Sequence, residues 1–530
     1  MSTLDYEHRY PSARMPVLAR NVVATSQPLA SQAGIRMLLE GGNAVDAALA
    51  GAIALTVVEP TSNGLGSDAS AIVWDGSGLH GLNASGRSPG ALDPNHLVGA
   101  TEMPLRGWHT VTVPGAVSGW VALSKRFGRL PFERLFHPAI AYARNGFPVS
   151  PITAHFWSTV AGDYADYPDF AKYFLPNGRV PAPGEVFRFE EQARTLELIA
   201  ESEGAALYHG ELADRIAAYS DESGGLLTGS DLAMHQSEWC DTISQAFGDV
   251  ELHELPPNGQ GLAALIMLGL LENVPFCDHA VDSVDSLHLQ IEAMKLALVD
   301  VRRYVAEPAC MEVSATDFLD AGYLTDRARL LDVKMARDPG HGVPRSGGTV
   351  YLTSADADGI MVSLIQSNCS NFGSGLVVPG TGISLQNRGS FFTLEPGHPN
   401  QVGGYKRPFN TIMPGFVTCG GMPLMSFGVI GGPMQPQGHA QMVIRTCFFG
   451  QNPQVAADAP RWRVMSGLEV AVEKGFPADV LEGLRQRGHR ITEYGVRESY
   501  LFGGAQLIYR LDDGYVAGSD QRRDGQAVGY

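Results

Sequence analysis

The spacing of apolar residues changes along the chain from a helical to a strand-like pattern. Residues 28–42 carry apolar side chains at helical spacing and end in two glycines, which can take the left-handed conformation that closes a helix. Residues 43–58 are rich in alanine and apolar on all sides, which predicts a helix buried on every face. From Val284 to Val301, apolar residues recur every three or four positions with charged residues between them, which predicts a surface helix that packs on a core.

A stretch rich in glycine and proline, residues 337–348, separates the helical sequence from strand-like sequence. Beyond it, residues 349–353 alternate between apolar and polar, residues 356–359 supply turn chemistry, and residues 360–366 alternate again. This pattern predicts a hairpin that begins at Thr349. Helices before the boundary and strands after it favour an α+β fold built of packed layers.

Composition and charge narrow the classes of partner. With 530 residues, 44% of them hydrophobic and 18% charged, the chain can bury a large globular core. The formal net charge of −18 and the lack of any basic run disfavour nucleic acid and anionic membranes as partners. The first twenty residues lack the apolar core of a secretion signal, and the six cysteines form no CxxC pair. We therefore expect a cytoplasmic protein with no metal and no cofactor.

Common catalytic motifs do not occur in the sequence. There is no GxSxG elbow, no HExxH pair and no phosphate-binding GxxxxGK[ST] loop. The segment Asn63-Gly64-Leu65-Gly66-Ser67 lacks the third glycine of a dinucleotide loop. By spacing alone, Gly347-Gly348-Thr349 could be a flexible loop that meets a strand.

Seven sequence blocks resemble the γ-glutamyltransferase family, and they occur in the order found in that family. They are GGNAVDAALA (41–50), VVEPTSNGLGS (57–67), TVPGAVSGW (112–120), FGSG (372–375), KRPFNTIMPGF (406–416), GVIGGPMQPQGH (428–439) and DAPRW (458–462). The resemblance extends from Asn21 to Tyr530. It implies an Ntn-hydrolase fold, in which two antiparallel sheets pack between helical layers as an αββα sandwich. It also implies self-cleavage into a large fragment, 1–348, and a small fragment, 349–530, which stay intertwined as a heterodimer or as a dimer of two such heterodimers.

The family's nucleophilic threonine matches Thr349, and the bond that is cut joins Gly348 to Thr349. Cleavage requires the Thr349 hydroxyl to attack the Gly348 carbonyl, and glycine tolerates the strained backbone that this attack needs. The freed amine has a reference pKa of about 7.7–8.0, so near neutral pH it can accept the hydroxyl proton. Nucleophile and general base are then one residue.

Other catalytic roles also follow from the resemblance. Gly431 and Gly432 match the glycine pair whose N–H groups form the oxyanion hole, although a plain tight turn is the alternative interpretation. Thr353 and Ser367 fall on family positions whose hydroxyls bond to the nucleophilic threonine and its amine. Their alternative interpretation is hydroxyls on strand faces.

The chain departs from the family where the substrate amino group is held. Three acceptors, an Asn, a Gln and an Asp, are replaced by Cys369, Arg388 and Phe391. The two serines that hold the substrate carboxylate become Asn410 and Thr411, and the carboxylate-binding arginine is displaced to Arg87. Guanidinium groups without amino-group acceptors suit a bare carboxylate better than a zwitterion. We therefore expect Arg87, Arg388, Phe391, Asn410 and Thr411 to bind a small anionic amide.

The segments LQNRG (385–389) and MQPQGH (434–439) resemble the branch of the family that hydrolyses oxamate. That resemblance implies conversion of oxamate to oxalate and ammonia in purine and allantoin nitrogen catabolism, with Arg87 or Arg388 on the carboxylate. Two alternatives remain open from the sequence. One is transfer or hydrolysis of γ-glutamyl compounds such as glutathione, and the other is an unprocessed scaffold without activity.

Overall fold

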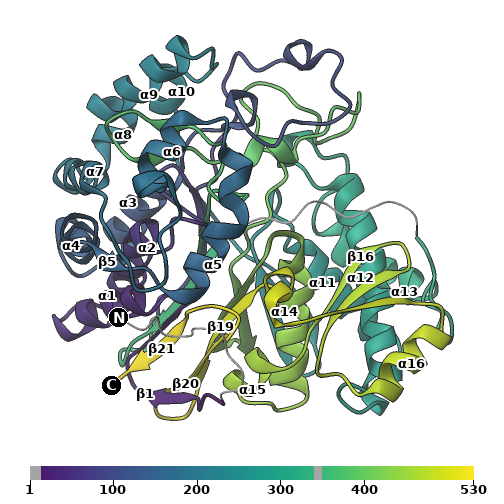
Figure 1. Cartoon of the computed structure of the whole chain (residues 1–530). Helices are drawn as coiled ribbons and strands as arrows, with labels where there is room; N and C mark the ends of the chain where they lie inside the picture. Colours follow the sequence, from purple (N-terminus) through teal and green to yellow (C-terminus); the bar gives the residue numbers. More distant parts are fainter. Residues whose placement is uncertain (1–12, 340–348) are drawn as a thin grey trace.

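The computed structural model describes residues 13–339 and 349–530, which form four layers (Figure 1). Two seven-stranded antiparallel sheets lie face to face, and helices cover the outer face of each. The predicted αββα sandwich is therefore confirmed. Sheet I has the order β21 (Gln526–Gly529), β2 (Val22–Thr25), β10 (Val350–Ala355), β11 (Met361–Ser367), β3 (Asp68–Trp74), β4 (Leu79–Asn83) and β7 (Glu238–Cys240). Sheet II has the order β1 (Val17–Ala19), β20 (Tyr515–Ser519), β19 (Gly504–Arg510), β15 (Met422–Ile430), β14 (Gly415–Cys419), β9 (Val250–Glu254) and β8 (Ile243–Phe247).

Strands from before and after residue 349 interleave in both sheets. In sheet I, β10 and β11 lie between β2 and β3, and β21 pairs with the outer edge of β2. In sheet II, β14 pairs with β9 and β20 pairs with β1. Neither part of the chain on its own forms a complete sheet.

The first helical layer covers sheet I. It contains α1 (Pro28–Leu39), α2 (Ala44–Val58), α3 (Ala116–Phe127), α4 (His137–Asn145), α5 (Pro151–Val160), α6 (Pro168–Phe174), α7 (Glu190–Glu201), α8 (Ala205–His209), α9 (Glu211–Glu222) and α10 (Gly229–Ala233). The Asn43 side chain accepts from the N–H groups of Val45 and Asp46, and the Asp46 carboxylate bonds the Asn43 N–H, which makes a capping box. All 15 residues of α2 are buried, as its uniform apolar pattern predicts.

The second helical layer covers sheet II. It contains α11 (Leu262–Leu271), α12 (Val284–Tyr304), α13 (Ala321–Ala328), α14 (Gln435–Val443) and α15 (Pro453–Asp458). A small sheet of β16 (Trp462–Ser466), β17 (Glu469–Glu473) and β18 (Arg490–Tyr494), with α16 (Ala478–Gln486), packs on the far side of α12. None of the helices in the described ranges is long and apolar enough to span a bilayer.

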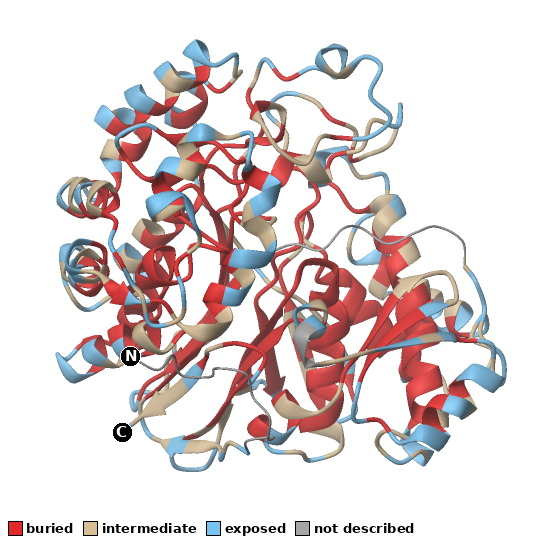
Figure 2. Cartoon of the chain, in the orientation of Figure 1, coloured by how far each residue is buried: buried red, intermediate tan, exposed pale blue. Residues whose placement is uncertain are grey.

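The prediction that α12 exposes one face is wrong. Helix α12 is buried along most of its length (Figure 2), because α16 and β16 cover the side that faces away from sheet II. Its charged residues Glu292, Lys295 and Asp300 are among the buried ones. Lys295 donates to Glu292 at 2.7 Å, and Asp300 pairs with Arg327 at 2.6 Å. Buried charges with partners of this kind look the same in sequence as a solvated face.

The predicted hairpin is confirmed, with β10 paired to β11 in antiparallel register. Every residue of both strands is buried, including the polar positions, because helix α2 packs against the hairpin and β15 of sheet II faces it. The polar side chains of this hairpin therefore lie in the interior, where each requires a hydrogen-bond partner.

Candidate active site

Thr349 lies at the start of β10 and is buried. Its Oγ1 is 3.1 Å from Oγ of Ser367, the last residue of β11. Ser367 Oγ also accepts the N–H of Cys369 at 2.8 Å, which fixes the orientation of the serine hydroxyl. Thr349 and Ser367 are thus brought together as the resemblance implies. Gly348 lies outside the described residues.

The hydrogen bond from the Cys369 N–H to Ser367 Oγ forms within a sharp turn that follows β11. Cys369 and Asn371 have φ angles of +78° and +50°, in the left-handed region that residues other than glycine rarely adopt. The N–H of Ser370 donates to the Asn387 side chain at 2.9 Å, and the N–H of Asn387 donates to the Asn368 carbonyl at 3.1 Å. These two bonds fix the conformation of the turn. They thereby keep the Cys369 N–H directed at Ser367.

The predicted contact between Thr353 and the nucleophile is wrong. The Thr353 hydroxyl is 2.6 Å from Ser426 Oγ and donates to the Val362 carbonyl at 2.9 Å. Thr353 is four residues further along the strand, which places it about 13 Å from Thr349. It links sheet I to β15 of sheet II, so its role is to join the two sheets.

The segments that carry the predicted site residues meet in one apolar cluster. The cluster consists of Tyr351, Ile365, Ile412 and Ile430. Its members lie two residues after Thr349, two before Ser367, next to Thr411 and next to Gly431. Close packing of these four side chains holds Thr349, Ser367, Thr411 and Gly431 in one region.

Gly431 and Gly432 follow β15 and have φ angles of +120° and +60°. They open a helical run that continues into α14, so their N–H groups lie at the positive end of a helix. The Gln260 side chain donates to the carbonyls of Gly432 at 2.9 Å and of Thr411 at 2.7 Å. This bridge fixes the glycine pair relative to the segment that carries Thr411. The arrangement suits stabilisation of an oxyanion.

A second backbone segment packs directly on the glycine pair. A Cβ on Gly431 would lie 3.0 Å from Cα of Gly503, and a Cβ on Gly503 would lie 2.0 Å from the Ile430 carbonyl oxygen. Gly503 also has a φ of +79°. Only glycine fits at this contact, which lets the backbone before β19 support Gly431 from behind.

A buried ion pair holds this supporting segment on both sides of Gly503. Arg461 donates to the Phe502 carbonyl at 2.8 Å, and the N–H of Ala505 donates to Asp520 at 2.7 Å. Arg461 and Asp520 are themselves 2.5 Å apart, and both are fully buried. Because the segment is bonded on both sides of Gly503, it has little freedom to move away from Gly431.

Arg388 is fully buried next to Asp68, the first residue of β3. Its Nη1 donates to Thr411 Oγ1 at 2.8 Å, and its Nε is 3.4 Å from Asp68 Oδ2. Asp68 lies directly opposite Ser367 in the pairing of β3 with β11, so the two side chains are on the same face of sheet I. The Nη2 of Arg388 has no hydrogen-bond partner among the described residues. A buried guanidinium with an unused donor is suited to an anionic group of a ligand.

Burial shifts the acid–base properties of the groups around Arg388. Loss of solvent raises the pKa of Asp68 to about 6, although Arg388 and the Gly86 N–H stabilise its charged form. Burial also raises the pKa of the Cys369 thiol, although the nearby Arg388 charge opposes this change. Asp68 therefore titrates close to neutral pH, and Cys369 stays protonated there.

The other predicted substrate-binding residues have different surroundings. Arg87 is partly exposed, with Nη1 2.9 Å from Glu307 and Nη2 3.3 Å from Glu238, so two carboxylates neutralise it. Asn410 is buried and accepts the N–H of Ile412 at 3.0 Å, which uses its side chain to shape the loop. Phe391 is half-buried, and the Arg388 guanidinium carbon lies 5.9 Å from its ring centre. Of the two predicted arginines, Arg388 is the one that is fully buried and has a donor without a hydrogen-bond partner among the described residues.

Several supporting residues escaped the sequence reasoning. Asp68 is the only charged residue in strand β3, and an isolated carboxylate in an apolar strand is a signal that could have revealed it. Gln260, Arg461 and Asp520 act through contacts with residues far away in the sequence, and no local spacing indicates them.

One group of side chains away from this site has potential metal ligands. His288, Glu292 and His489 bring ligand atoms within 4.8 Å of one another. However, Glu292 already accepts from Lys295 at 2.7 Å, and His288 Nδ1 is 2.8 Å from His489 Nε2. The Lys295 ammonium group supplies the positive charge beside the carboxylate. All six cysteines of the chain lie in the described ranges, and each is a free thiol.

Comparisons with known proteins agree with this geometry. The family model described as gamma-glutamyltranspeptidase matches residues 30–530. The chain is 36% identical to the glutathione hydrolase-like YwrD proenzyme of Bacillus subtilis, over 96% of this chain and 98% of that protein. It is 33% identical to the oxamate amidohydrolase proenzyme of Klebsiella pneumoniae, over 95% and 97%. The crystal structure of a cephalosporin acylase from Bacillus halodurans superimposes with a TM-score of 0.96 at 46% identity, covering 100% of this chain and 99% of that one.

Proposed function

Because the chain belongs to the gamma-glutamyltranspeptidase family, we propose that it cleaves itself before Thr349 and then hydrolyses an amide whose acyl half carries a carboxylate. The predicted products of cleavage are fragments 1–348 and 349–530, which stay together as a heterodimer. The interleaved strands of both sheets support this assembly. Oxamate is the smallest substrate that fits the description, and oxalate and ammonia would be its products.

The proposed chemistry uses Thr349 twice. In the precursor, the hydroxyl attacks the preceding carbonyl, the peptide C–N bond breaks, and water hydrolyses the resulting ester to free the Thr349 amine. In the mature enzyme, that amine accepts the hydroxyl proton as Oγ1 bonds to the substrate carbonyl, and it returns the proton to the leaving nitrogen. Water then releases the acid. The hydroxyl of Ser367, 3.1 Å from Oγ1, orients the nucleophile, and Gly431 and Gly432 stabilise the oxyanion.

The observation that supports a carboxylate-bearing substrate is the environment of Arg388. Its guanidinium is fully buried, lies 3.4 Å from Asp68, which is opposite Ser367 in the register of β3 and β11, and keeps Nη2 without a partner among the described residues. A carboxylate of the substrate would satisfy that donor. The same cation disfavours the γ-glutamyl alternative, because a free ammonium group would then face Arg388 instead of acceptors.

The proposal is tested on freshly purified protein in two steps. Intact mass spectrometry should show two fragments that meet at Gly348 and Thr349. Ammonia release should then be measured with oxamate, and anilide release with a γ-glutamyl anilide, on the same sample. Cleaved protein that acts only on the γ-glutamyl compound would contradict the assigned substrate class, and an uncut inactive chain would support the scaffold alternative.

Comparison of Arg388→Met with Arg87→Met separates the two arginines. If Arg388 binds the carboxylate, its loss should raise KM for oxamate by about tenfold or more, since hydrogen bonds to charged groups contribute about 1.5–3 kcal/mol. The same change at Arg87 should have a much smaller effect, because two protein carboxylates already neutralise that guanidinium. The reverse result would assign the clamp to Arg87.

A further inference from the structure

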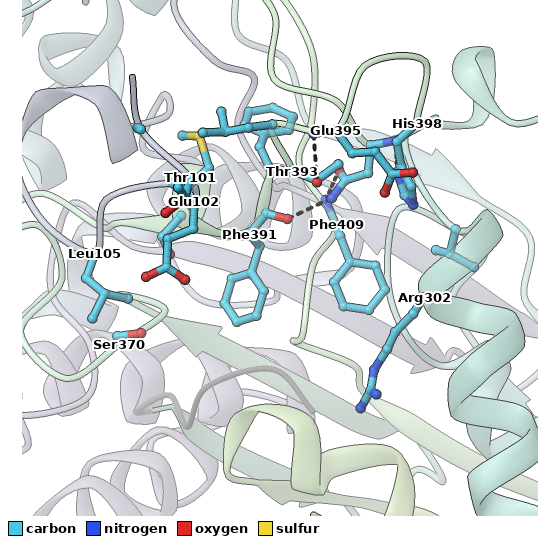
Figure 3. A pocket seen from close by; sticks show the side chains of 17 residues that line it. Thr101, Glu102, Leu105, Arg302, Ser370, Phe391, Thr393, Glu395, His398 and Phe409 are labelled. Atoms are coloured by element: carbon cyan, nitrogen blue, oxygen red, sulfur yellow. Dashed lines mark hydrogen bonds between the residues drawn. The ribbon is translucent and has the colours of Figure 1, made fainter. Parts of the chain in front are cut away.

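A cavity of about 760 Å³ lies beside the candidate active site (Figure 3). Its walls come from the loop 100–105, the end of α12 and the segment 390–395. Oxamate would fill only a small part of this volume, which is in the range of pockets that hold drug-sized ligands, roughly 300–1,000 Å³. The cavity therefore offers room for a larger substrate than the minimal one.

The cavity adjoins Arg388, the residue proposed to bind the substrate carboxylate. Ser370 and Ser390 line it, and Cys369, which contacts both serines, packs beside Arg388. Phe391 also lines the cavity, and the Arg388 guanidinium carbon lies 5.9 Å from the centre of its ring. The cavity therefore adjoins the residues around Arg388. A group that enters the cavity belongs to the acyl half of the substrate.

Two aromatic rings line one part of the cavity. The rings of Phe391 and Phe409 lie next to each other with centres 6.3 Å apart, and Met103 and Leu105 add further apolar surface. Figure 3 shows Glu102 on one side of the ring pair and Arg302 on the other. Glu395 also lines the cavity, so polar and charged groups surround the ring pair. The two rings are the apolar part of the lining, and they offer faces against which an aromatic ring of a ligand can pack.

We propose that this cavity binds an apolar aromatic substituent on the acyl half of the substrate, placed next to the carboxylate that Arg388 holds. This inference rests on the proposed function and extends it from oxamate to amides of larger, aryl-substituted acids. In hydrolysis of such an amide, the C–N bond breaks, ammonia or an amine leaves, and water supplies the hydroxyl of the released acid. The ring stays between Phe391 and Phe409 throughout, so it contributes to binding and positioning.

Three amides that all release ammonia test the inference in one assay. N-benzoyl-L-glutamine carries the carboxylate and an aromatic substituent, glutaramate carries the same chain without the substituent, and L-glutamine carries a free ammonium group in its place. We expect kcat/KM for N-benzoyl-L-glutamine to exceed that for glutaramate by about tenfold, with L-glutamine the poorest of the three. Equal kcat/KM for the first two would overturn the proposal.

Two variants locate the ring. Phe409→Leu keeps an apolar side chain but removes the aromatic face, and it should reduce the preference for the benzoyl compound by roughly threefold to tenfold. Thr101→Trp fills the cavity from an exposed loop position and should abolish the preference. Kinetics on glutaramate should stay unchanged in both, which shows that each variant is folded and active. A preference that survives both variants would mean that the ring binds elsewhere.

Hydrolysis of oxamate and glutaramate distinguishes failure of this inference from failure of the proposed function on which it rests. If oxamate and glutaramate are hydrolysed but the benzoyl group gives no gain, the cavity assignment fails and the proposed function stands. If correctly cleaved protein hydrolyses none of the carboxylate-bearing amides, the proposed function fails and this inference fails with it.

Discussion

The contact between Gly503 and Gly431, one of the two glycines proposed to stabilise the oxyanion, leads to a quantitative prediction for Gly503→Ala. A Cβ at this position would lie 2.0 Å from the Ile430 carbonyl oxygen, whereas real contacts of this kind are at least 3.0 Å. The two backbones would have to separate by about 1 Å, and a misplacement of that size can reduce a rate by about 10²-fold. Arg461 and Asp520 hold the Gly503 segment, so the displacement should fall on Ile430 and Gly431.

The same change should also reduce stability. Gly503 has φ +79° and ψ −151°, a backbone region that is essentially restricted to glycine, so alanine there costs about 1–3 kcal/mol, and overpacking adds about 1–3 kcal/mol. Gly421→Ala is a control for an added Cβ at positive φ without a steric contact, because Gly421 has a φ of +76° and a Cβ there would have no atom within 4 Å. In this control, the free energy of unfolding should fall only by the cost of alanine at a positive φ, and kcat should stay unchanged.

The assay combines kinetics with unfolding. The cleaved fraction is determined by mass spectrometry, kcat and KM for oxamate are measured per cleaved site, and urea unfolding gives the stability of each variant. We expect Gly503→Ala to lower kcat by about 10²-fold with little change in KM, since the oxyanion exists only in the transition state. A kcat within twofold of that of Gly421→Ala would refute the reasoning.

Four further predictions concern Thr349 and its surroundings. Thr349→Ala should give a single uncut and inactive chain by mass spectrometry, and a cleaved active variant would contradict the mechanism. Ser367→Ala should slow both cleavage and turnover, by about tenfold or more in kcat, because the hydroxyl that orients Thr349 is lost; unchanged kcat would rule out that role. Asp68, with its pKa raised to about 6, should make KM for an anionic amide fall as pH drops through 6, because its protonation leaves the Arg388 charge unopposed; this trend should vanish in Asp68→Asn. In the folded protein Asp68 ionises only near pH 6 but in the unfolded chain near pH 4, so stability should decrease as pH rises through that window, and urea unfolding of Asp68→Asn should lack this slope.

Local sequence patterns predicted the elements whose environment they encode. The alanine-rich segment of α2 and the hairpin from Thr349 were recognised because their spacing and turn residues are local properties. The exposure of α12 was predicted wrongly, since buried charges paired across space resemble a solvated face. Thr353 was misplaced for a related reason: a hydroxyl on the correct face of a strand still needs the correct distance along it.

The sequence predicts a site residue only where a local motif identifies it. The choice between Arg87 and Arg388 required the positions of Glu238, Glu307 and Asp68, which lie far apart in the sequence. The same holds for the bridge from Gln260 to Gly432, which joins segments 172 positions apart. Such contacts depend on the assembled sheets, so no periodicity reveals them.

The alternation of strands within both sheets has a consequence for the lifetime of the enzyme. In the precursor, folding is a unimolecular process, because every strand belongs to one covalent chain. After cleavage, the fragments share five strand pairings, β21 with β2, β2 with β10, β11 with β3, β1 with β20 and β14 with β9. They cannot separate without breaking both sheets, and reassembly from denatured fragments becomes second order in protein concentration. Cleavage before Thr349 would therefore make activation a one-way event: the cleaved protein should refold poorly when it is diluted out of denaturant, whereas the uncut precursor should refold at a rate that does not depend on concentration.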